Sequence, residues 1–392
     1  MVSQEPRVAG FRFSGVESSI KKRGGLDLGL VVTDSPIAVA GMFTRNLVRA
    51  APLVVCERRV SAHRDVRAIL VNSGNANACT GAPGMQATLD TCSALARELG
   101  IGEEQVLPAS TGVIGQVLPT EKVIAALPRL RAGLEVDATR FAQAIMTTDR
   151  WSKIEVLPVG GATVLGIAKG AGMIHPDVGP PQATMLVFLF TDAKMGRRSL
   201  QAMLAEACEH SFNICTVDGD TSTNDTVLAL ASGLAQDAPS EDALGQALSD
   251  VCQRLAQSMV LDGEGAAHAA TIEVRGLKSD RDARTVARTV ATSLLVKTAM
   301  SGCDANWGRL LAAAGRAGIE FDPAQAGIAI GGIPIVTNGL PVGPEAETRA
   351  NEIMKGQTYR IEIVLGDGPG LASYMTSDLG HGYVDVNAGY RT

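Results

Sequence analysis

A threonine at the start of an apolar run is the first feature of this sequence that could do chemistry. Thr184 follows a stretch rich in glycine and proline, Gly172 to Gln182, and precedes the run from Met185 to Phe190. Proline and glycine are disfavoured inside helices and central strands, so we expect an exposed loop followed by a buried strand. A hydroxyl at that position could be a nucleophile, although spacing alone favours an ordinary strand residue.

Two other segments invite a binding-site interpretation. Thr216 to Asp225 reads TVDGDTSTND, but it lacks the glutamate that a calcium loop has at its twelfth position, so we expect its acids to cap turns and helix ends. The segment GDGPG at Gly366 to Gly370 is interrupted by Pro369 and is not followed by a helical pattern, which argues against a dinucleotide site. We predict no metal site and no cofactor.

The elements that must position Thr184 follow an alternation typical of an α/β layered fold. Apolar, β-branched runs predict strands at residues 28–32, 38–43, 68–71, 163–168, 185–190, 226–231 and 359–365. Helical spacing predicts helices at 85–99, 200–209 and 243–259. A further helix should begin after Ser279, with Asp282 completing a capping box and an apolar stripe at Ala283, Val286, Ala287, Val290, Ala291, Leu294 and Leu295.

The length and composition of the chain exclude several classes of function. The 392 residues allow two or three domains, or one large α/β unit, at roughly 150 residues per domain. The net charge of −6 and the lack of a basic stripe argue against nucleic acid or an anionic membrane as a partner. Seven cysteines without CxxC spacing, and no apolar leader, predict a cytoplasmic chain without disulfides or structural zinc.

Ordered motifs across the whole chain resemble the ornithine acetyltransferase family, the bifunctional glutamate N-acetyltransferases of arginine biosynthesis. Around Thr184 they are KGAGMI from Lys169, then Pro176, then Ala183-Thr184-Met185-Leu186. The others are GFRFSGVESSIKKRGGLDLGLVVTD, GMFTRN, VNSGNANACTG, STGVIG, IMTTD, TVDGDTSTND, DGEG, LVKTA, NWGR and the final VNAGYRT.

The resemblance implies a DmpA-like fold with mixed sheets flanked by helices, and a precursor that cuts its own chain between Ala183 and Thr184. Residues 1–183 would form an alpha chain and residues 184–392 a beta chain, assembled as a heterotetramer of two alpha and two beta chains. The freed α-amine of Thr184 has an unperturbed pKa of roughly 7.7 to 8.0, so it could act as the general base for its own hydroxyl.

The resemblance also assigns the remaining site residues. Thr111 and Gly112 would stabilise the oxyanion of the tetrahedral intermediate. The substrate contacts would be Thr147 or Thr148, Lys169, Thr184, Glu264, Asn387 and Thr392. On its own, STGVIG would be an ordinary turn before a strand, Glu264 a solvated turn carboxylate, and Asn387 a residue of a frayed tail.

The implied reaction moves an acetyl group from N2-acetylornithine to glutamate through an acetyl-Thr184 ester, with ping-pong kinetics. The loop before Ala183 is four residues longer than is usual in the family, which leaves the rate of cleavage open. Acetyl-CoA stays open as a second donor, because AAH follows Glu264 where ATK is common. An N-terminal-nucleophile amidohydrolase or aminopeptidase is the alternative enzyme. A non-enzymatic binding module, with an intact chain, is the third hypothesis.

Overall fold

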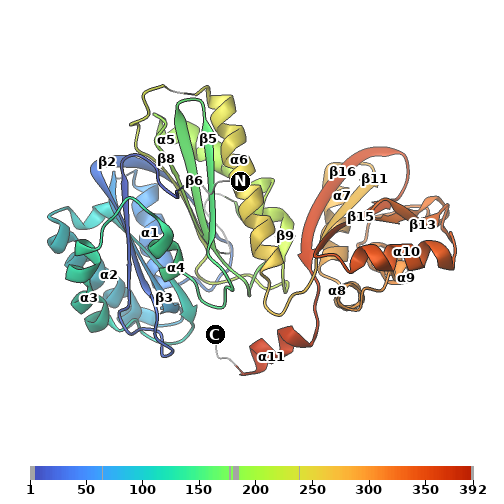
Figure 1. Cartoon of the computed structure of the whole chain (residues 1–392), viewed down its shortest axis with the longest axis horizontal. Coiled ribbons are helices and arrows are strands. Elements are labelled where there is room, and N and C mark those ends of the chain that lie inside the picture. Colours follow the sequence, from blue (N-terminus) through green and yellow to red (C-terminus); the bar gives the residue numbers. More distant parts are fainter. Residues whose placement is uncertain (1–4, 64, 176–177, 180–184, 238, 390–392) are drawn as a thin grey trace. The chain divides into compact units, whose positions relative to one another are not determined.

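The computed structural model describes residues 5–63, 65–175, 178–179, 185–237 and 239–389, the pair 178–179 by its backbone alone. These residues form two units, each with its own sheet (Figure 1). Unit 1 comprises the residues up to 213 together with 221–259, and unit 2 comprises 214–220 together with the residues from 260 onward. The acid-rich segment Thr216 to Asp225 therefore contributes to both units.

A single bent strand, β2 (Leu28–Thr44), organises unit 1. The predicted strands at 28–32 and 38–43 are its two halves, separated by a break in register between Val32 and Ile37. The first half pairs with β1 (Phe11–Val16) and β3 (Val66–Asn75), and the second half pairs with β10 (Thr226–Ala231). The strand order is β4-β3-β2-β10-β8-β6-β5, with β4 (Val106–Val113), β8 (Leu186–Thr191), β6 (Ala162–Lys169) and β5 (Lys153–Val159).

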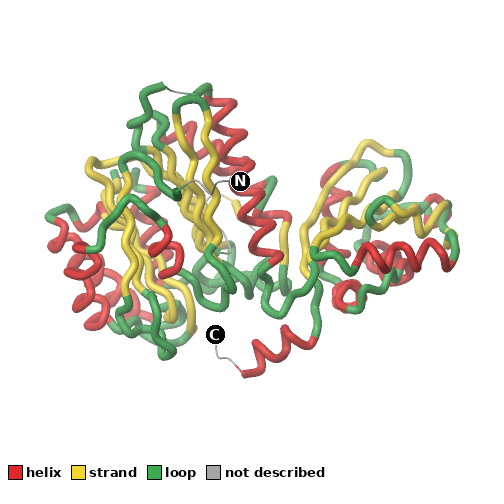
Figure 2. The backbone as a smooth tube through the Cα atoms, viewed as in Figure 1, coloured by secondary structure: helices red, strands yellow, loops and turns green. Residues whose placement is uncertain are grey.

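The two halves of this sheet face each other across a core, with helices outside. Val31 and Ile69 of the first half share a buried cluster with Phe188 of the second half. Alternate residues such as Leu30 and Leu70 pack instead against helices α2 and α3. Unit 1 therefore has its strands between helical layers (Figure 2). Its helices are α1 (Ala51–Ser61), α2 (Gly81–Leu99), α3 (Thr120–Ala132), α4 (Thr139–Ala144), α5 (Arg197–Glu209) and α6 (Glu241–Leu261), the last ending in unit 2.

Unit 2 is a second mixed sheet with the order β14-β13-β12-β15-β11-β16-β9. Its strands are β9 (Cys215–Thr216), β11 (Ala269–Gly276), β12 (Gly327–Ile330), β13 (Ile333–Thr337), β14 (Leu340–Pro341), β15 (Thr358–Val364) and β16 (Gly368–Ser377). Its helices are α7 (Asp280–Ala291), α8 (Leu294–Ser301), α9 (Trp307–Gly315), α10 (Pro344–Met354) and α11 (His381–Gly389). The segment GDGPG thus leads into a strand and not into a helix.

Helix α7 begins as predicted and ends earlier. The Ser279 hydroxyl accepts a hydrogen bond from the Asp282 amide at 3.2 Å, which confirms the N-cap. The apolar stripe is buried only as far as Ala291, and Leu294 and Leu295 are 65% and 60% exposed. The chain stops the helix at Thr292 and starts α8 at Leu294, so these two leucines no longer share the face of α7.

Replacing the cap of α7 should cost measurable stability. We expect Ser279→Ala to lower the free energy of unfolding by about 1 kcal/mol, because the Asp282 amide would lose its acceptor. Ser293→Ala is the matched control, since Ser293 precedes α8 without a side-chain cap hydrogen bond. Urea unfolding of both variants would measure the difference, and equal losses would contradict the capping role.

The segment before Thr184 departs from the prediction of an exposed loop. Ile174 and His175 are buried, with 2% and 5% of their surface exposed. Further on, Val178–Gly179 forms a short strand, β7, that pairs with the end of β2 at Phe43 and Thr44. This part of the segment belongs to the sheet, because two extended residues beside the free edge of a strand can form ladder hydrogen bonds despite their proline-rich surroundings.

Candidate functional site

Thr111 and Gly112 lie at the carboxyl end of β4, so STGVIG begins as the end of a strand and not as a turn before one. Gly112 pairs with Gly74 of β3 and has a φ of +129°. A Cβ atom on Gly112 would lie 2.4 Å from the Gly74 carbonyl carbon and 2.6 Å from the Asn75 nitrogen. Only glycine fits this backbone, since a side chain would collide with the main chain of β3.

Lys169 joins Thr111 from the opposite half of the sheet. It is the last residue of β6, is only 7% exposed, and pairs with Leu186 of β8. Its Nζ donates a hydrogen bond to Thr111 Oγ1 at 3.4 Å. The structure thus brings together two residues that are 58 positions apart in the chain. Lys169 lies beside β8, the strand that starts two residues after Thr184.

Asn224 fixes the start of β8 and β10 against the end of β4. Its Nδ2 donates to the carbonyl oxygens of Ala76 at 2.6 Å and Ser110 at 2.8 Å. The Thr226 amide donates to the Met185 carbonyl at 2.6 Å. The end of TVDGDTSTND and the NSGNAN segment are therefore joined by hydrogen bonds next to Thr111. Ala183, Thr184 and Thr392 lie outside the described residues.

Asp149, which the sequence reasoning passed over, connects Lys169 to the predicted threonines. Thr147 and Thr148 are both half-buried, and the Thr147 amide donates to Asp149 Oδ2 at 2.9 Å. Asp149 Oδ1 accepts from Lys153 Nζ at 2.7 Å and from the Gly170 amide at 2.6 Å. The signal was present in the sequence as an acid directly after two threonines, with a lysine four positions later.

The charge state of Asp149 follows from its neighbours. Burial by itself raises the pKa of this carboxyl, but Lys169 and Lys153, together with hydrogen bonds from Lys153 and the Thr147 amide, outweigh burial and lower the pKa to about 2. Asp149 is therefore an anion at neutral pH, in contact with Lys153 and close to Lys169.

Unit 2 holds Glu264 and Asn387 in direct contact. Asn387 lies within helix α11 and its Nδ2 donates to Glu264 Oε2 at 2.8 Å. Glu264 is only 8% exposed, so it is neither a solvated turn carboxylate nor paired with a frayed tail. A Cβ atom on Gly265, whose φ is +67°, would lie 2.1 Å from the Gly382 carbonyl carbon. The DGEG turn can approach α11 this closely because residue 265 is glycine.

Comparison with known proteins decides the family. A family model described as the ArgJ family matches residues 12–392. The arginine biosynthesis bifunctional protein ArgJ of Syntrophotalea carbinolica is 45% identical over 98% of this chain and 100% of its own length. Its counterpart in Nitratidesulfovibrio vulgaris is 44% identical, with 98% of both chains covered. The chain belongs to the ArgJ family.

Similar proteins with solved structures include the following two. The ArgJ protein of Bacillus halodurans shares 38% identity over 52% of this chain and 98% of that chain, with a TM-score of 0.49. The ornithine acetyltransferase of Mycobacterium tuberculosis, solved as a complex with ornithine, shares 37% identity over 46% of this chain and 98% of that chain, with a TM-score of 0.42.

Family membership confirms the resemblance found from the ordered motifs. The prediction of an acyltransferase of arginine biosynthesis is confirmed with it. The predicted α/β fold with mixed sheets flanked by helices is confirmed as well. No helix among the described residues is long and apolar enough to cross a membrane.

A third buried lysine among the described residues, Lys297, lies in the same unit as Glu264. Lys297 Nζ donates to Thr376 Oγ1 at 2.9 Å and to the Ser377 carbonyl. The next residue, Asp378, accepts the amides of Ala267 and His268 at 2.9 Å. Burial lowers the pKa of Lys297 to about 8, although Asp378 and Asp218 act in the opposite direction. LVKTA was recognised as a motif, but no periodicity marked its lysine as buried.

The lowered pKa of Lys297 predicts a pH-dependent stability. Between about pH 8 and the unfolded value of roughly 10.4, the unfolded chain binds the proton that the folded chain has lost. The unfolding free energy contributed by this group should therefore rise with pH across that window, and should be unfavourable and constant below it. Urea unfolding of the natural chain and Lys297→Met at pH 7 and pH 9.5 would test this, and parallel curves would contradict it.

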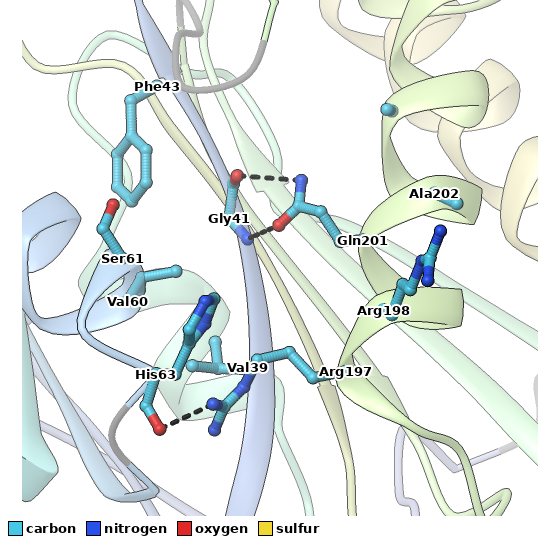
Figure 3. A pocket seen from close by; sticks show the side chains of 11 residues that line it. Val39, Gly41, Phe43, Val60, Ser61, His63, Arg197, Arg198, Gln201 and Ala202 are labelled. Carbon is cyan, nitrogen blue, oxygen red and sulfur yellow. Dashed lines mark hydrogen bonds between the residues drawn. The ribbon is translucent and has the colours of Figure 1, made fainter.

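A groove of about 900 Å³ between α1, α5 and the second half of β2 is lined by none of the predicted site residues that the structure describes (Figure 3). Gln201 reaches across it from α5: its Oε1 accepts the Gly41 amide at 3.0 Å, and its Nε2 donates to the Gly41 carbonyl at 3.2 Å. These are the bonds that a neighbouring strand would make. Gln201 thus satisfies the backbone at an edge of β2 that no described strand covers between Ile37 and Phe43.

Proposed function

We propose that this ArgJ-family chain transfers the acetyl group of N2-acetylornithine to glutamate through an ester on Thr184, after cleaving itself between Ala183 and Thr184. The new α-amine takes the proton of the Thr184 hydroxyl, and the oxygen attacks the acetyl carbonyl. Ornithine leaves with its nitrogen protonated. The amine of glutamate then attacks the ester and releases N-acetylglutamate and the free hydroxyl.

One contact supports this proposal above the others, the hydrogen bond from Lys169 to Thr111. Lys169 pairs with Leu186, two residues after the proposed nucleophile, and Thr111 precedes the glycine that approaches the backbone of β3. An oxyanion formed at Thr184 needs donors about 2.7 to 3.1 Å away. The Thr111 hydroxyl and the Gly112 amide are the proposed donors, and the Lys169 ammonium adds positive charge beside them.

Ornithine carries an ammonium at the end of its side chain, so its pocket requires an anion. We assign this role to the buried Glu264, whose orientation Asn387 fixes at 2.8 Å. Lys169 and one of Thr147 and Thr148 are assigned to the substrate in unit 1, and Thr392 to the substrate at the C-terminus. The choice between the two threonines stays open, since both are half-buried.

The proposed cleavage would leave interleaved chains. Strands β8 and β10 follow Thr184, but they lie in the sheet of unit 1 beside β6 and β2, which precede it. Ladder hydrogen bonds and the shared core would hold the two chains together after the cut. We further propose that two such pairs assemble as a heterotetramer, so that light scattering should give twice the 40.7 kDa mass of one chain.

The decisive experiment combines an intact mass with a transfer assay. Cleavage predicts fragments of 183 and 209 residues. Incubation with N2-acetylornithine should release ornithine only when glutamate is present, in parallel with N-acetylglutamate formation. Ornithine release that does not depend on glutamate would support the hydrolase, and an uncut, inactive chain would contradict both enzyme hypotheses. Adding acetyl-CoA in place of N2-acetylornithine tests the second donor.

A further inference from the structure

We propose that Asp149 is a positioning residue of the acetyl-transfer site, which holds the Lys169 corner and the Thr147–Thr148 turn in one arrangement around Thr111. This inference rests on the proposed function and deepens it. Asp149 is not expected to touch the substrate. It acts through backbone hydrogen bonds at or next to residues that are proposed to contact the substrate.

The two carboxylate oxygens of Asp149 serve different parts of the site. Oδ2 accepts the Thr147 amide at 2.9 Å and so fixes the turn that carries the two candidate threonines. Oδ1 accepts the Gly170 amide at 2.6 Å, directly after Lys169. Gly170 has a φ of +153°, and a Cβ atom there would lie 2.8 Å from Ile174 Cδ1. A side chain is disfavoured in this backbone conformation, and Asp149 accepts the amide of the glycine that adopts it.

Electrostatics make the arrangement dependent on the negative charge. The side chains of Asp149 and Lys153 are fully buried, 2.7 Å apart, and Lys169 is the cation with the largest influence on the carboxylate. Lys21 is also close enough for Asp149 and Lys169 to affect its pKa, which burial lowers. Asp149 thus lies among three buried or half-buried ammonium groups, of which Lys21 also has Asp27 nearby. Without it, Lys169 would be pushed away from Thr111 by the other cations.

The Lys153 contact offers an alternative explanation that a pair of variants can separate. Asp149 could serve only to neutralise buried Lys153, in which case it would matter for stability alone. Asp149→Asn keeps the shape of the side chain, but only its one amide oxygen can accept a hydrogen bond. It also leaves Lys153 without its anion. Lys153→Met removes the ammonium and leaves the Gly170 and Thr147 bonds in place. The double variant removes both charges.

We expect Asp149→Asn to lower kcat/KM for acetyl transfer by about 100-fold, the size of effect that a displacement of about 1 Å can have. The fall should be mainly in kcat if the oxyanion donors shift. Lys153→Met should retain kcat/KM within about threefold, because the two backbone bonds remain. The double variant should regain the melting temperature lost in Asp149→Asn but not its activity.

Two outcomes would overturn the inference. One is a double variant whose activity returns to the natural level along with its melting temperature. The other is a Lys153→Met variant that loses as much activity as Asp149→Asn. This second outcome can be measured even if the double variant does not fold. A denaturing gel first shows that each variant has been cleaved. Activity is then compared between cleaved variants and the natural chain. Failure of the proposed function would instead appear in the natural chain, as missing cleavage or missing transfer.

Discussion

Thr184→Ala should leave a single chain of 40.7 kDa and abolish acetyl transfer, with a loss of more than about 10⁴-fold in kcat/KM. In the proposed mechanism two events depend on the same hydroxyl. It would attack the preceding peptide carbonyl during cleavage, and it would attack the acetyl group during transfer. Alanine has no oxygen for either, and an uncut chain has no free α-amine to act as base.

The matched variant for this prediction is Thr184→Ser, which keeps the hydroxyl and would keep the amine after cleavage. It should still be processed and should retain measurable transfer. Intact mass and a coupled ornithine assay give both readouts. If Thr184→Ala is cut normally, or transfers acetyl groups at the natural rate, then the nucleophile lies elsewhere and the self-processing mechanism is wrong for this chain.

Gly112→Ala is expected to have the second largest effect, a fall in kcat/KM of about 100-fold to 1000-fold, the range seen when one oxyanion donor is lost. The new methyl group would meet the backbone of Gly74 and Asn75 at 2.4 and 2.6 Å. Neither strand can yield without moving the Gly112 amide and the Thr111 hydroxyl. The change should also lower the melting temperature.

Gly115→Ala provides the control for that variant. Gly115 also has a positive φ, +84°, but a Cβ atom there would have no neighbour within 4 Å. Alanine at 115 should therefore cost backbone strain of about 1 kcal/mol without displacing the oxyanion donors. If both variants lose activity equally, the loss reports general strain in STGVIG and not a role for Gly112.

Local patterns in the sequence were sufficient for six of the sixteen strands and four of the eleven α-helices in the described part of the chain. The limits predicted for β10, 226–231, agree with the structure, and the cap of α7 was found from Ser279 and Asp282 alone. Both depend on residues within a few positions of one another. The predicted extension of the α7 stripe to Leu294 and Leu295 was wrong. The apolar residues keep their 3.6-residue spacing across Thr292 and Ser293, although the helix itself ends before these two residues.

The candidate site shows a similar limit. Motifs identified Thr111, Lys169, Glu264 and Asn387, and the structure places them in two contacting pairs, Lys169 with Thr111 and Asn387 with Glu264. No spacing in the sequence predicts that Lys169 faces Leu186, because strand register is set by the whole sheet. Asp149 and Lys297 were missed for the same reason, since their importance comes from burial beside distant partners.

The sequence by itself determined which chemical groups this chain has and which family it belongs to. Hydroxyls, lysines, acids and glycines at set positions are properties of the residues, and the order of the motifs can be read from the linear chain. Only the tertiary structure decided their neighbours. The bend in β2 brings two half-sheets face to face, so that the end of β4 and the end of β6 meet at Thr111 and Lys169. Such contacts arise from packing over the entire core, which no local pattern encodes.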